Sequence, residues 1–502
     1  MKTGLGATVH LLRAGLVILA HDAFCPPAYQ HRLPWWLRLM SGLARALSPY
    51  ARRDANTGVR LARALEGLGP AYIKLGQLMS MRPDIFGLEL TKGLETLKDA
   101  LPAAPDAQAR KTVEAELGQP VETLFTEFGP AAAAASLAQV HKATTPDGQT
   151  VAVKILRPGI EARVARDLDS LRLAARWVRR LVKPSKRMKP EAFVETVARS
   201  MELELDLRLE AAGCAEFRTL DLPGTTTPAV VWGLSAKRVL TLSWLEGEAL
   251  NRAQLSDDDR QRLATIVMQS FLKQALTYGV FHADSHEGNL LVTPGGQLGY
   301  VDFGIMGRLS ENERVWLARI LWGFLARDYH GAAQAHFDAG YVPSHHRLED
   351  FAQALRAVGE PIFGQDAAQI SMGRVLEQLF DITALYDMEL REELILLQKT
   401  MVAAEGAARA LDPNFDMWAT SKPVVESFLK SALSPTARLK RFGQSVRTTA
   451  LAFRDLPQKI NQIEQALSQP RHRALWPWAL LTGLVVGAGL MAVILVMMTS
   501  GF

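Results

Sequence analysis

The chain has 502 residues, of which 48% are hydrophobic and 22% charged, and its formal net charge is +5. This length and composition are typical of a globular protein with several structural units, and they exclude a disordered or fibrous chain. Its two cysteines have no partners at metal-ligand spacing, which excludes a disulfide framework, argues against structural zinc and fits a reducing compartment.

The N-terminal residues 3–24 are apolar but are interrupted by His10 and Arg13, and no small-residue cleavage site follows them. They predict an amphipathic helix and not a secretory signal, with an organelle-targeting segment as the alternative. Helical periodicity then continues to about residue 100 and ends at the proline-containing break LPAAPDA.

A region of mixed secondary structure follows. Residues 136–156 contain two alternating, strand-compatible runs joined by TPDG, which predicts a β-hairpin. A compact second hairpin is predicted for NLLVTPGGQLGYVDFG. The other predicted elements are helices at 160–183, 189–220 and 256–279, a strand at 237–245 and helical structure from 310 to 430.

A small α/β unit followed by a mainly helical unit is what the two lobes of a kinase would look like. We therefore predict an α+β, bilobal, protein-kinase-like fold with an N-terminal helical extension and a C-terminal transmembrane helix. The predicted boundaries are 1–105 for the extension, 106–246 for the N-lobe, 247–430 for the C-lobe, 431–474 for a basic juxtamembrane segment and 475–499 for the transmembrane helix.

Three short features in this order are explained by phosphoryl transfer. Lys154 ends VAVK on a strand, where a fixed cation can pair with nucleotide phosphates. Asp284 and Asn289 have the D-x4-N spacing of a kinase catalytic loop, and Asp302 begins DFG. Taken singly, these are a solvated lysine, a polar turn and a common tripeptide. Together they predict a site for ATP and Mg²⁺, with Asn289 and Asp302 as metal ligands and Asp284 orienting a hydroxyl.

The predicted phosphate-binding loop is rich in alanine. The stretch GPAAAAASLAQVH includes Ala133, Ala134, Ala135 and Ser136 where a glycine-rich loop would be expected. Alanine restricts the backbone more than glycine, so a stiffer loop would hold the terminal phosphates differently. A helical alanine tract is the alternative.

The C-terminal part carries a basic segment and then an apolar one. Residues 430–473 contain nine Lys or Arg against two acids, directly before 23 uncharged residues at 476–498. As a helix this run would be about 34 Å long, enough to cross a bilayer. The basic flank predicts that the preceding chain is cytoplasmic, and it gives no reason to expect nucleic-acid binding. Gly483 and Gly487 form a GxxxG pair that could support a homodimer.

Over residues 60 to 415 the sequence resembles the UbiB family of atypical kinases, which includes mitochondrial proteins that support coenzyme Q synthesis. The matching motifs include KxGQ at 74–77, the alanine-rich loop, VAVK, an ExD element at 204–206, HAD followed by GN, DFG and EGAARALDP at 405–413. The family loop usually reads HADPHPGN, whereas Ser285 and Glu287 replace both prolines here, which puts the rigidity of this loop in doubt.

The resemblance implies further site residues. Glu210 would be the helix partner of Lys154, and Trp244 and Leu245 would belong to the ATP-binding residues. A regulatory lid over the active site would place two residues of KxGQ against two acids of ExD. These lid residues are Lys74, Gln77, Glu204 and Asp206.

The resemblance also implies a function in ubiquinone biosynthesis, as a membrane-anchored kinase or ATPase that uses MgATP. Membrane lipid, quinone intermediates and other quinone-biosynthesis enzymes would be its partners. The lack of a clear presequence favours the bacterial inner membrane over the mitochondrial one. A protein kinase acting in trans and a nucleotide-binding pseudokinase scaffold are the alternatives.

Overall fold

The computed structural model describes residues 2–21, 23, 56–82, 86–97, 102–181, 189–363, 378, 382, 385–388, 392–432 and 434. The chain divides into two units, Met1–Leu429 and Lys430–Phe502, and the account below concerns the first. No helix among the described residues is both long and apolar enough to cross a membrane. The predicted transmembrane helix at 475–499 lies outside the described residues, as does nearly all of the basic segment before it.

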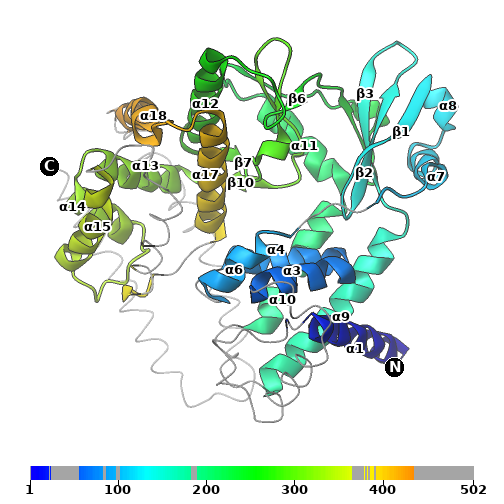
Figure 1. Ribbon diagram of the computed structural model, residues 1–502, viewed down its shortest axis with the longest axis horizontal. Coiled ribbons are helices and arrows are strands. Elements are labelled where there is room, and N and C mark those ends of the chain that lie inside the picture. The colour runs from blue at the N-terminus through cyan, green and yellow to red at the C-terminus, as the bar shows by residue number, and fades with distance from the viewer. Residues whose placement is uncertain are drawn as a thin grey trace, which may run out of the picture. The chain divides into compact units, whose positions relative to one another are not determined.

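The N-lobe is built on an antiparallel sheet with the strand order β1-β2-β3-β5 (Figure 1). Its strands are β1 (Glu127–Ala134), β2 (Ala138–Thr144), β3 (Thr150–Leu156) and β5 (Val239–Ser243). Strands β2 and β3 confirm the first predicted hairpin, since Ala138 pairs with Leu156 and Thr144 with Thr150. Helices α7 (Asp106–Leu117) and α8 (Val121–Leu124) pack their apolar side chains against one face of this sheet.

The alternation of side chains along β3 places Lys154. Val151, Val153 and Ile155 are fully buried in the small core beneath α7 and α8. Because successive residues of a strand point to opposite faces, Lys154 lies on the other face of the sheet. The core of the N-lobe thus fixes the direction in which this lysine points.

The alanine tract is not a helix. Residues 131–134 belong to β1, where Ala131 pairs with His141 and Ala134 with Gln139, and the register shifts between Phe128 and Ala133. The helical alternative is therefore wrong. Pairing with β2 supplies the backbone hydrogen bonds that an isolated alanine run would otherwise obtain as a helix, so tertiary context overrides local propensity.

Three helices follow β3 in the chain. Helix α9 (Ile160–Leu181) confirms its prediction, but the predicted helix at 189–220 is two helices, α10 (Pro190–Glu204) and α11 (Leu207–Arg218). Asp206 separates them, because its side chain accepts a hydrogen bond from the backbone N–H of Arg208 and so caps the start of α11.

The C-lobe is mainly helical and holds two short sheets. Strand β7 pairs with β10, and β8 pairs antiparallel with β9, which confirms the second predicted hairpin. Its elements are β4 (Thr225–Thr226), β6 (Glu248–Ala249), α12 (Asp257–Leu272), η4 (Lys273–Tyr278), β7 (Val280–His282), η5 (Glu287–Asn289), β8 (Leu290–Val292), β9 (Leu298–Tyr300), β10 (Met306–Arg308), α13 (Glu311–Leu325), α14 (Tyr329–Asp338), α15 (Leu348–Phe363), α17 (Glu392–Leu411) and α18 (Met417–Ala432). The short helix η3 (Trp232–Leu234) lies beside β5 and packs against the N-lobe core.

The N-terminal extension is helical, as predicted, and packs against α9 and α10 (Figure 1). Its helices are α1 (Lys2–Ala20), α3 (Thr57–Leu68), α4 (Pro70–Ser80) and α6 (Leu88–Leu94). Helices α3 and α6 approach closely at Gly58 and Gly93, where neither residue has a side chain to separate the two backbones.

We predict that Gly93→Ala destabilises the extension. A Cβ atom at this position would lie 2.5 Å from the carbonyl carbon of Gly58 and 2.5 Å from the nitrogen of Val59, so the two helices would have to move apart. The expected loss in the free energy of unfolding is about 1–3 kcal/mol, measured by urea denaturation. The control is Gly67→Ala on α3, where a Cβ atom has no neighbour within 4 Å. An equal loss in both variants would contradict close packing as the cause.

Candidate functional site

Three charged side chains from separate segments meet at the centre of the site. The Nζ of Lys154 lies 2.7 Å from Oε1 of Glu210 on α11 and 2.9 Å from Oδ1 of Asp302 after β9. Burial by itself would lower the pKa of Lys154, but the charges of Asp302 and Glu210 outweigh burial and raise that pKa above its ordinary value. Burial raises the pKa of Glu210, whereas the charge of Lys154 opposes that shift.

Asp302 is held in an unusual backbone conformation. Its φ is +60°, a left-handed conformation that is uncommon outside glycine, and its Oδ1 accepts a hydrogen bond from the backbone N–H of Gly304. The charge of Lys154 lowers the pKa of Asp302 to about 2. The carboxylate is therefore ionised at neutral pH, and its side chain is half exposed, so it is accessible to a ligand.

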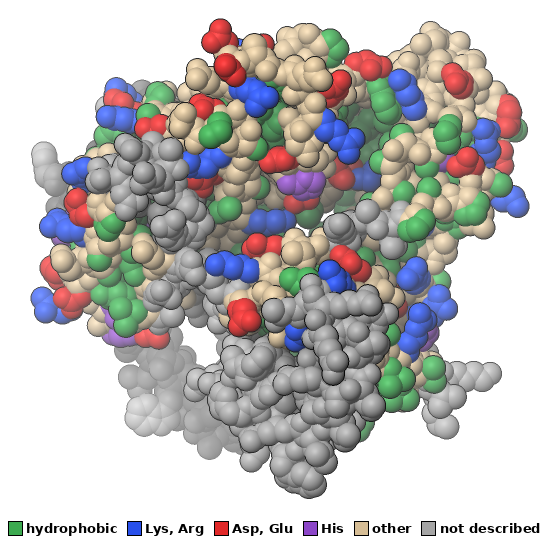
Figure 2. All heavy atoms as spheres, in the orientation of Figure 1, with side chains coloured by type: hydrophobic (Ala, Val, Ile, Leu, Met, Phe, Trp, Pro, Cys, Tyr) green, Lys and Arg blue, Asp and Glu red, His purple; other side chains and the backbone are tan. Residues whose placement is uncertain are grey.

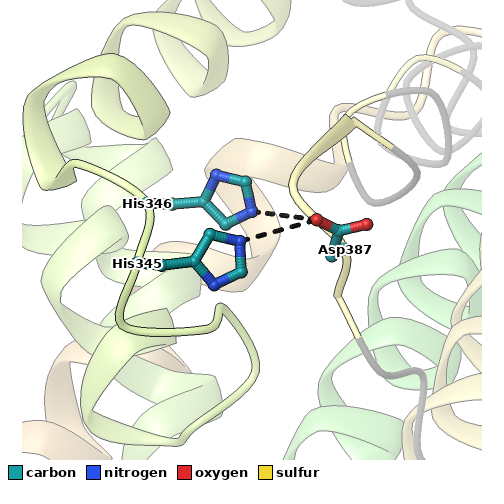
Figure 3. A group of neighbouring side chains, drawn as sticks. All are labelled: His345, His346 and Asp387. Carbon is teal, nitrogen blue, oxygen red and sulfur yellow. Dashed lines mark hydrogen bonds and ion pairs between the residues drawn. The ribbon is translucent and has the colours of Figure 1, made fainter.

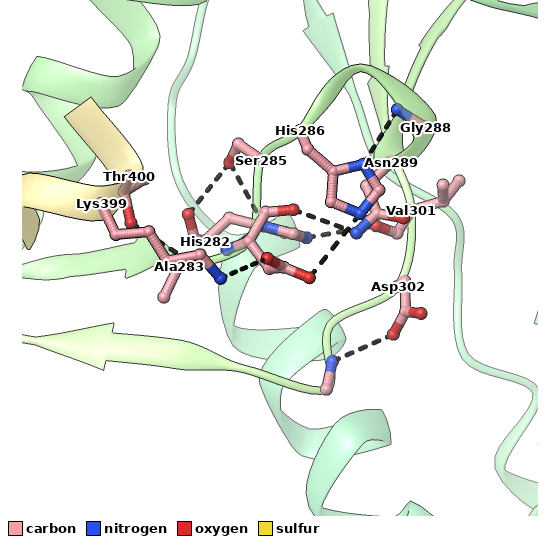
Figure 4. A network of polar contacts seen from close by, with 12 residues as sticks. His282, Ala283, Ser285, His286, Gly288, Asn289, Val301, Asp302, Lys399 and Thr400 are labelled. Atoms are coloured by element: carbon pink, nitrogen blue, oxygen red, sulfur yellow. Dashed lines mark hydrogen bonds and ion pairs between the residues drawn. The ribbon is translucent and has the colours of Figure 1, made fainter. Parts of the chain in front are cut away.

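The catalytic-loop residues are organised around His282, which is fully buried. Its Nε2 lies 3.1 Å from the carbonyl oxygen of Val301, and its Nδ1 lies 3.3 Å from the backbone nitrogen of Asp284 (Figure 4). The ring thus donates from Nε2 and accepts at Nδ1. Burial lowers the pKa of His282, so the neutral form that this arrangement requires is favoured. The histidine joins the segment that carries Asp284 to the segment that carries Asp302.

Ser285 takes the place of a proline in the family loop without leaving the loop unsupported. Its side chain is buried, and its hydroxyl donates to the carbonyl oxygen of His282 at 3.0 Å. The same hydroxyl lies 3.2 Å from Nδ1 of that ring. Hydrogen bonds therefore restrain the backbone of the loop at Ser285, where the resemblance led us to expect a proline.

Asn289 and Asp302 fit a magnesium site by their chemistry. The side-chain amide of Asn289 donates to the carbonyl oxygen of Asp284 at 3.0 Å, which leaves the amide oxygen as an acceptor. The carbonyl oxygen of Asn289 accepts from the backbone N–H of Val301, next to Asp302. Mg²⁺ prefers oxygen ligands of this kind, usually one or two from the protein with the rest from phosphates and water.

Lys399 is a site residue that the sequence did not reveal. Its Nζ lies 3.0 Å from Oδ1 of Asp284, and the hydroxyl of the neighbouring Thr400 donates to the carbonyl oxygen of Ala283 at 3.2 Å (Figure 4). Both residues lie on α17, and Lys399 is 115 residues from Asp284 along the chain. Lys399 reaches the loop that carries Asp284 only through the packing of α17, so no sequence motif identifies it.

The predicted lid residues are brought together only in part. Lys74 on α4 is buried and forms an ion pair with Glu204 at the end of α10. Asp206 instead lies 2.6 Å from the guanidinium of Arg208 and caps α11. The expectation that Lys74 lies between both acids is therefore wrong for Asp206, since the helix cap and its arginine occupy that carboxylate. Gln77 is half-buried on the next turn of α4.

The remaining predicted nucleotide residues lie on the N-lobe sheet and just after it. Ala133 and Ala134 end β1, and the backbone N–H of Ala135 donates to the carbonyl oxygen of Ala138, which closes the loop that contains Ser136. The backbone N–H of Trp244 donates to Thr150 at the edge of the sheet. Leu245 packs against Gly299 of β9 in the C-lobe. Figure 2 shows acidic, basic and histidine side chains around a hollow on one face of the molecule.

Comparison with known proteins agrees with this geometry. Residues 96–336 match the ABC1 atypical kinase-like domain, and residues 355–416 match the UbiB helical domain. The "Probable protein kinase UbiB" of Pseudomonas paraeruginosa is 35% identical over 87% of this chain and 84% of its own length. The chain belongs to the UbiB family. Relatives of the same name from Pseudomonas putida and Marinobacter nauticus are 35% and 36% identical over 91% and 80% of this chain, and over 88% and 76% of their own lengths.

A solved structure supports the kinase-like fold of this UbiB-family chain. The complex of Rv3197 with erythromycin from Mycobacterium tuberculosis is 25% identical and superposes with a TM-score of 0.50. The match covers 73% of this chain and 94% of that one. In this family framework, Lys154, Asp284 and Asp302 lie in the kinase-like domain, whereas Lys399 comes from the helical domain.

We predict that Lys74→Ala loosens the attachment of α4 to α10. The substitution leaves the carboxylate of Glu204 largely buried without the cation that the structure gives it. Amide hydrogen exchange in α4 should become faster by on the order of tenfold, measured by mass spectrometry. Lys111→Ala on the surface of α7 is the control and should leave exchange in α4 unchanged. Unchanged exchange in α4 of the Lys74 variant would show that the ion pair does not hold this helix.

Proposed function

We propose that this chain is an atypical kinase or ATPase that binds MgATP and supports ubiquinone biosynthesis at a membrane. The observation that carries the proposal is the convergence of Lys154, Glu210 and Asp302, with Nζ of the lysine 2.7 and 2.9 Å from the two carboxylates. A cation on a strand, its acidic partner on a helix and the aspartate of DFG are the parts that phosphoryl transfer from ATP requires.

Each residue of the site would have a separate role. Lys154 would bind phosphate oxygens while Glu210 keeps it in place, and Asn289 and Asp302 would hold Mg²⁺. The ion that these two residues would hold would supply positive charge against the negative charge of the phosphates. Asp284 would orient the attacking hydroxyl or water, and the loop hydrogen bonds through His282 fix its backbone.

Lys399 adds a second cation, next to Asp284. A cation at this distance from the orienting carboxylate would also lie close to the phosphoryl group in transfer, where it would stabilise negative charge. Since Thr400 fixes the same turn of α17 to the catalytic loop, the position of the cation is restrained before ATP binds. The helical domain would thus complete a site that the kinase-like domain begins.

Several observations support a membrane location and a quinone pathway. The relatives carry the name UbiB and come from bacteria, which favours a bacterial over a mitochondrial membrane, and the basic residues at 430–473 favour its cytoplasmic face. Val9, Leu12 and Leu16 are exposed along α1, and the apolar run at 476–498 is long enough to span a bilayer. Quinone intermediates in the membrane, or the enzymes that modify them, would be the partners, and the GxxxG pair in this run would allow a homodimer.

A protein kinase acting in trans is the second candidate, because the relatives are named "Probable protein kinase UbiB". The ion pair between Lys74 and Glu204 favours the first candidate. It fastens the extension to the kinase-like domain at the ExD element, and an extension held there would cover the cleft that a protein substrate needs. Transfer of phosphate to added proteins would support the second candidate.

We predict that Asp302→Asn abolishes magnesium-dependent binding of ATP, because the neutral amide replaces the only carboxylate among the proposed metal ligands. Isothermal titration of the full chain with MgATP measures the loss, and thermal unfolding checks that the variant is folded. Asp221→Asn, at an exposed position, is the control. In a strain that lacks the gene, only the wild type and the control should restore ubiquinone. An Asp302 variant that binds MgATP like the parent would contradict the metal assignment.

We predict that Lys399→Met lowers kcat for ATP turnover by about 10²–10³-fold with little change in the affinity for MgATP. The variant removes a charge beside Asp284 but leaves Lys154 and the metal ligands in place. Lys399→Arg should recover part of the rate, and Lys422→Met on the surface of α18 serves as the control. A faster turnover in the methionine variant would mean that Lys399 restrains Asp284 in an idle state, and it would refute the assigned role.

A further inference from the structure

Two histidines and an aspartate meet on the C-lobe, apart from the nucleotide site. His345 and His346 lie in the connection between α14 and α15, and Asp387 lies in the described segment Leu385–Met388 that precedes α17. Figure 3 shows both rings directed toward the carboxylate of Asp387. The Nε2 atoms of the two rings are 3.6 and 3.3 Å from the same oxygen, Oδ2.

These separations suit three ligands of one metal ion. Zn²⁺ binds histidine nitrogen and carboxylate oxygen at about 2.0–2.2 Å, so two ligand atoms of a tetrahedral site are about 3.4 Å apart. The usual N–H···O hydrogen bond is shorter, at about 2.9 Å; the contact of His346 at 3.3 Å is a long hydrogen bond, and that of His345 at 3.6 Å is too long for one. The donor atoms of His345, His346 and Asp387 all lie within 4.8 Å of one another. The distances from the two imidazole nitrogens to the carboxylate oxygen therefore match those between ligands of one metal ion. A cation between the three side chains would bind all of them, so that the two imidazoles would no longer compete for one oxygen.

The cluster rests on the buried core of the C-lobe. His346 is only 19% exposed, and its ring contacts Tyr386 edge-on with centroids 5.2 Å apart. Tyr386 in turn contacts the fully buried Phe351 of α15 at 5.0 Å. His345 lies against His346 with ring centroids 4.1 Å apart. Aromatic packing thus restrains His346 and the segment that carries Asp387, so these ligands are positioned before a metal binds.

We propose that His345, His346 and Asp387 form a zinc site. Two imidazoles and a carboxylate are ligands that Zn²⁺ accepts, and the exposure of His345 and Asp387, at 65% and 69%, leaves the fourth position open to water. The scarcity of cysteines excludes thiolate ligands, but this site needs none. Zinc would link residues 41 positions apart in the sequence, across α15 and up to the segment before α17. Closing such a loop stabilises the folded chain.

The test is zinc binding by the full-length protein, without an affinity tag, after removal of metal with a chelator. Isothermal titration with ZnCl₂ should detect one equivalent in the wild type. The double variant H345A/H346A and the single variant Asp387→Ala should each bind this equivalent at least tenfold more weakly. His330→Ala, an exposed histidine of α14 outside the cluster, is the matched control and should bind as the wild type does.

Three further measurements keep the result unambiguous. Asp302→Asn separates this site from the nucleotide site: zinc lost in that variant but kept in H345A/H346A would overturn the proposal. Thermal unfolding without metal shows whether each variant folds, and the unfolding midpoint of the wild type should rise with ZnCl₂ while that of a folded cluster variant should not. Co²⁺ in place of Zn²⁺ should give the intense visible absorption of a tetrahedral site in the wild type. A six-coordinate spectrum, or equal zinc binding by all variants, would refute the proposal.

Discussion

The structure of the site depends on one ion-pair arrangement, in which Lys154 contacts both Glu210 and Asp302. The three residues come from β3, from α11 and from the segment after β9, so this contact joins the N-lobe sheet to the C-lobe hairpin. Lys154 and Glu210 are largely buried, and the opposite charge of each offsets the cost of burying the other, whereas Asp302 is half exposed. A nucleotide with its metal would enter a place where one cation faces two carboxylates, and Lys154 would exchange one carboxylate for phosphate oxygens.

The catalytic loop depends on support from further away. His282 lies at the centre of a buried network that binds Val301 on one side and the backbone of Asp284 on the other. Ser285 adds hydrogen bonds to the carbonyl oxygen and the ring of His282. From the opposite direction, α17 contributes Thr400 and Lys399. The geometry of one carboxylate is thus set by the kinase-like domain and by the helical domain together.

The N-terminal extension contributes through packing and through an ion pair with α10. Close contact of α3 with α6 at two glycines makes a compact helical layer, and Lys74 fastens α4 to the end of α10. Asp206, two residues beyond Glu204, serves a different purpose, because it caps α11 and binds Arg208. A short acidic motif therefore has two structural roles, one in the attachment of the extension and one at the start of the helix that carries Glu210.

Local patterns in the sequence determined the parts of this protein that short-range physics controls. Alternation along 150–156 and the turn at TPDG specified the hairpin that carries Lys154, and the spacing of Asp284, Asn289 and Asp302 marked residues that share one chemistry. Only the tertiary structure decided the rest. The alanine tract is a strand because β2 pairs with it, and the helix predicted at 189–220 is divided by the cap at Asp206. Lys399 and the cluster of His345, His346 and Asp387 carry no local signal, since their partners lie 115 and about 41 residues away in the chain. Only the tertiary packing of helices and of the segments between them brings such residues together, and no periodicity or motif in a single sequence records it.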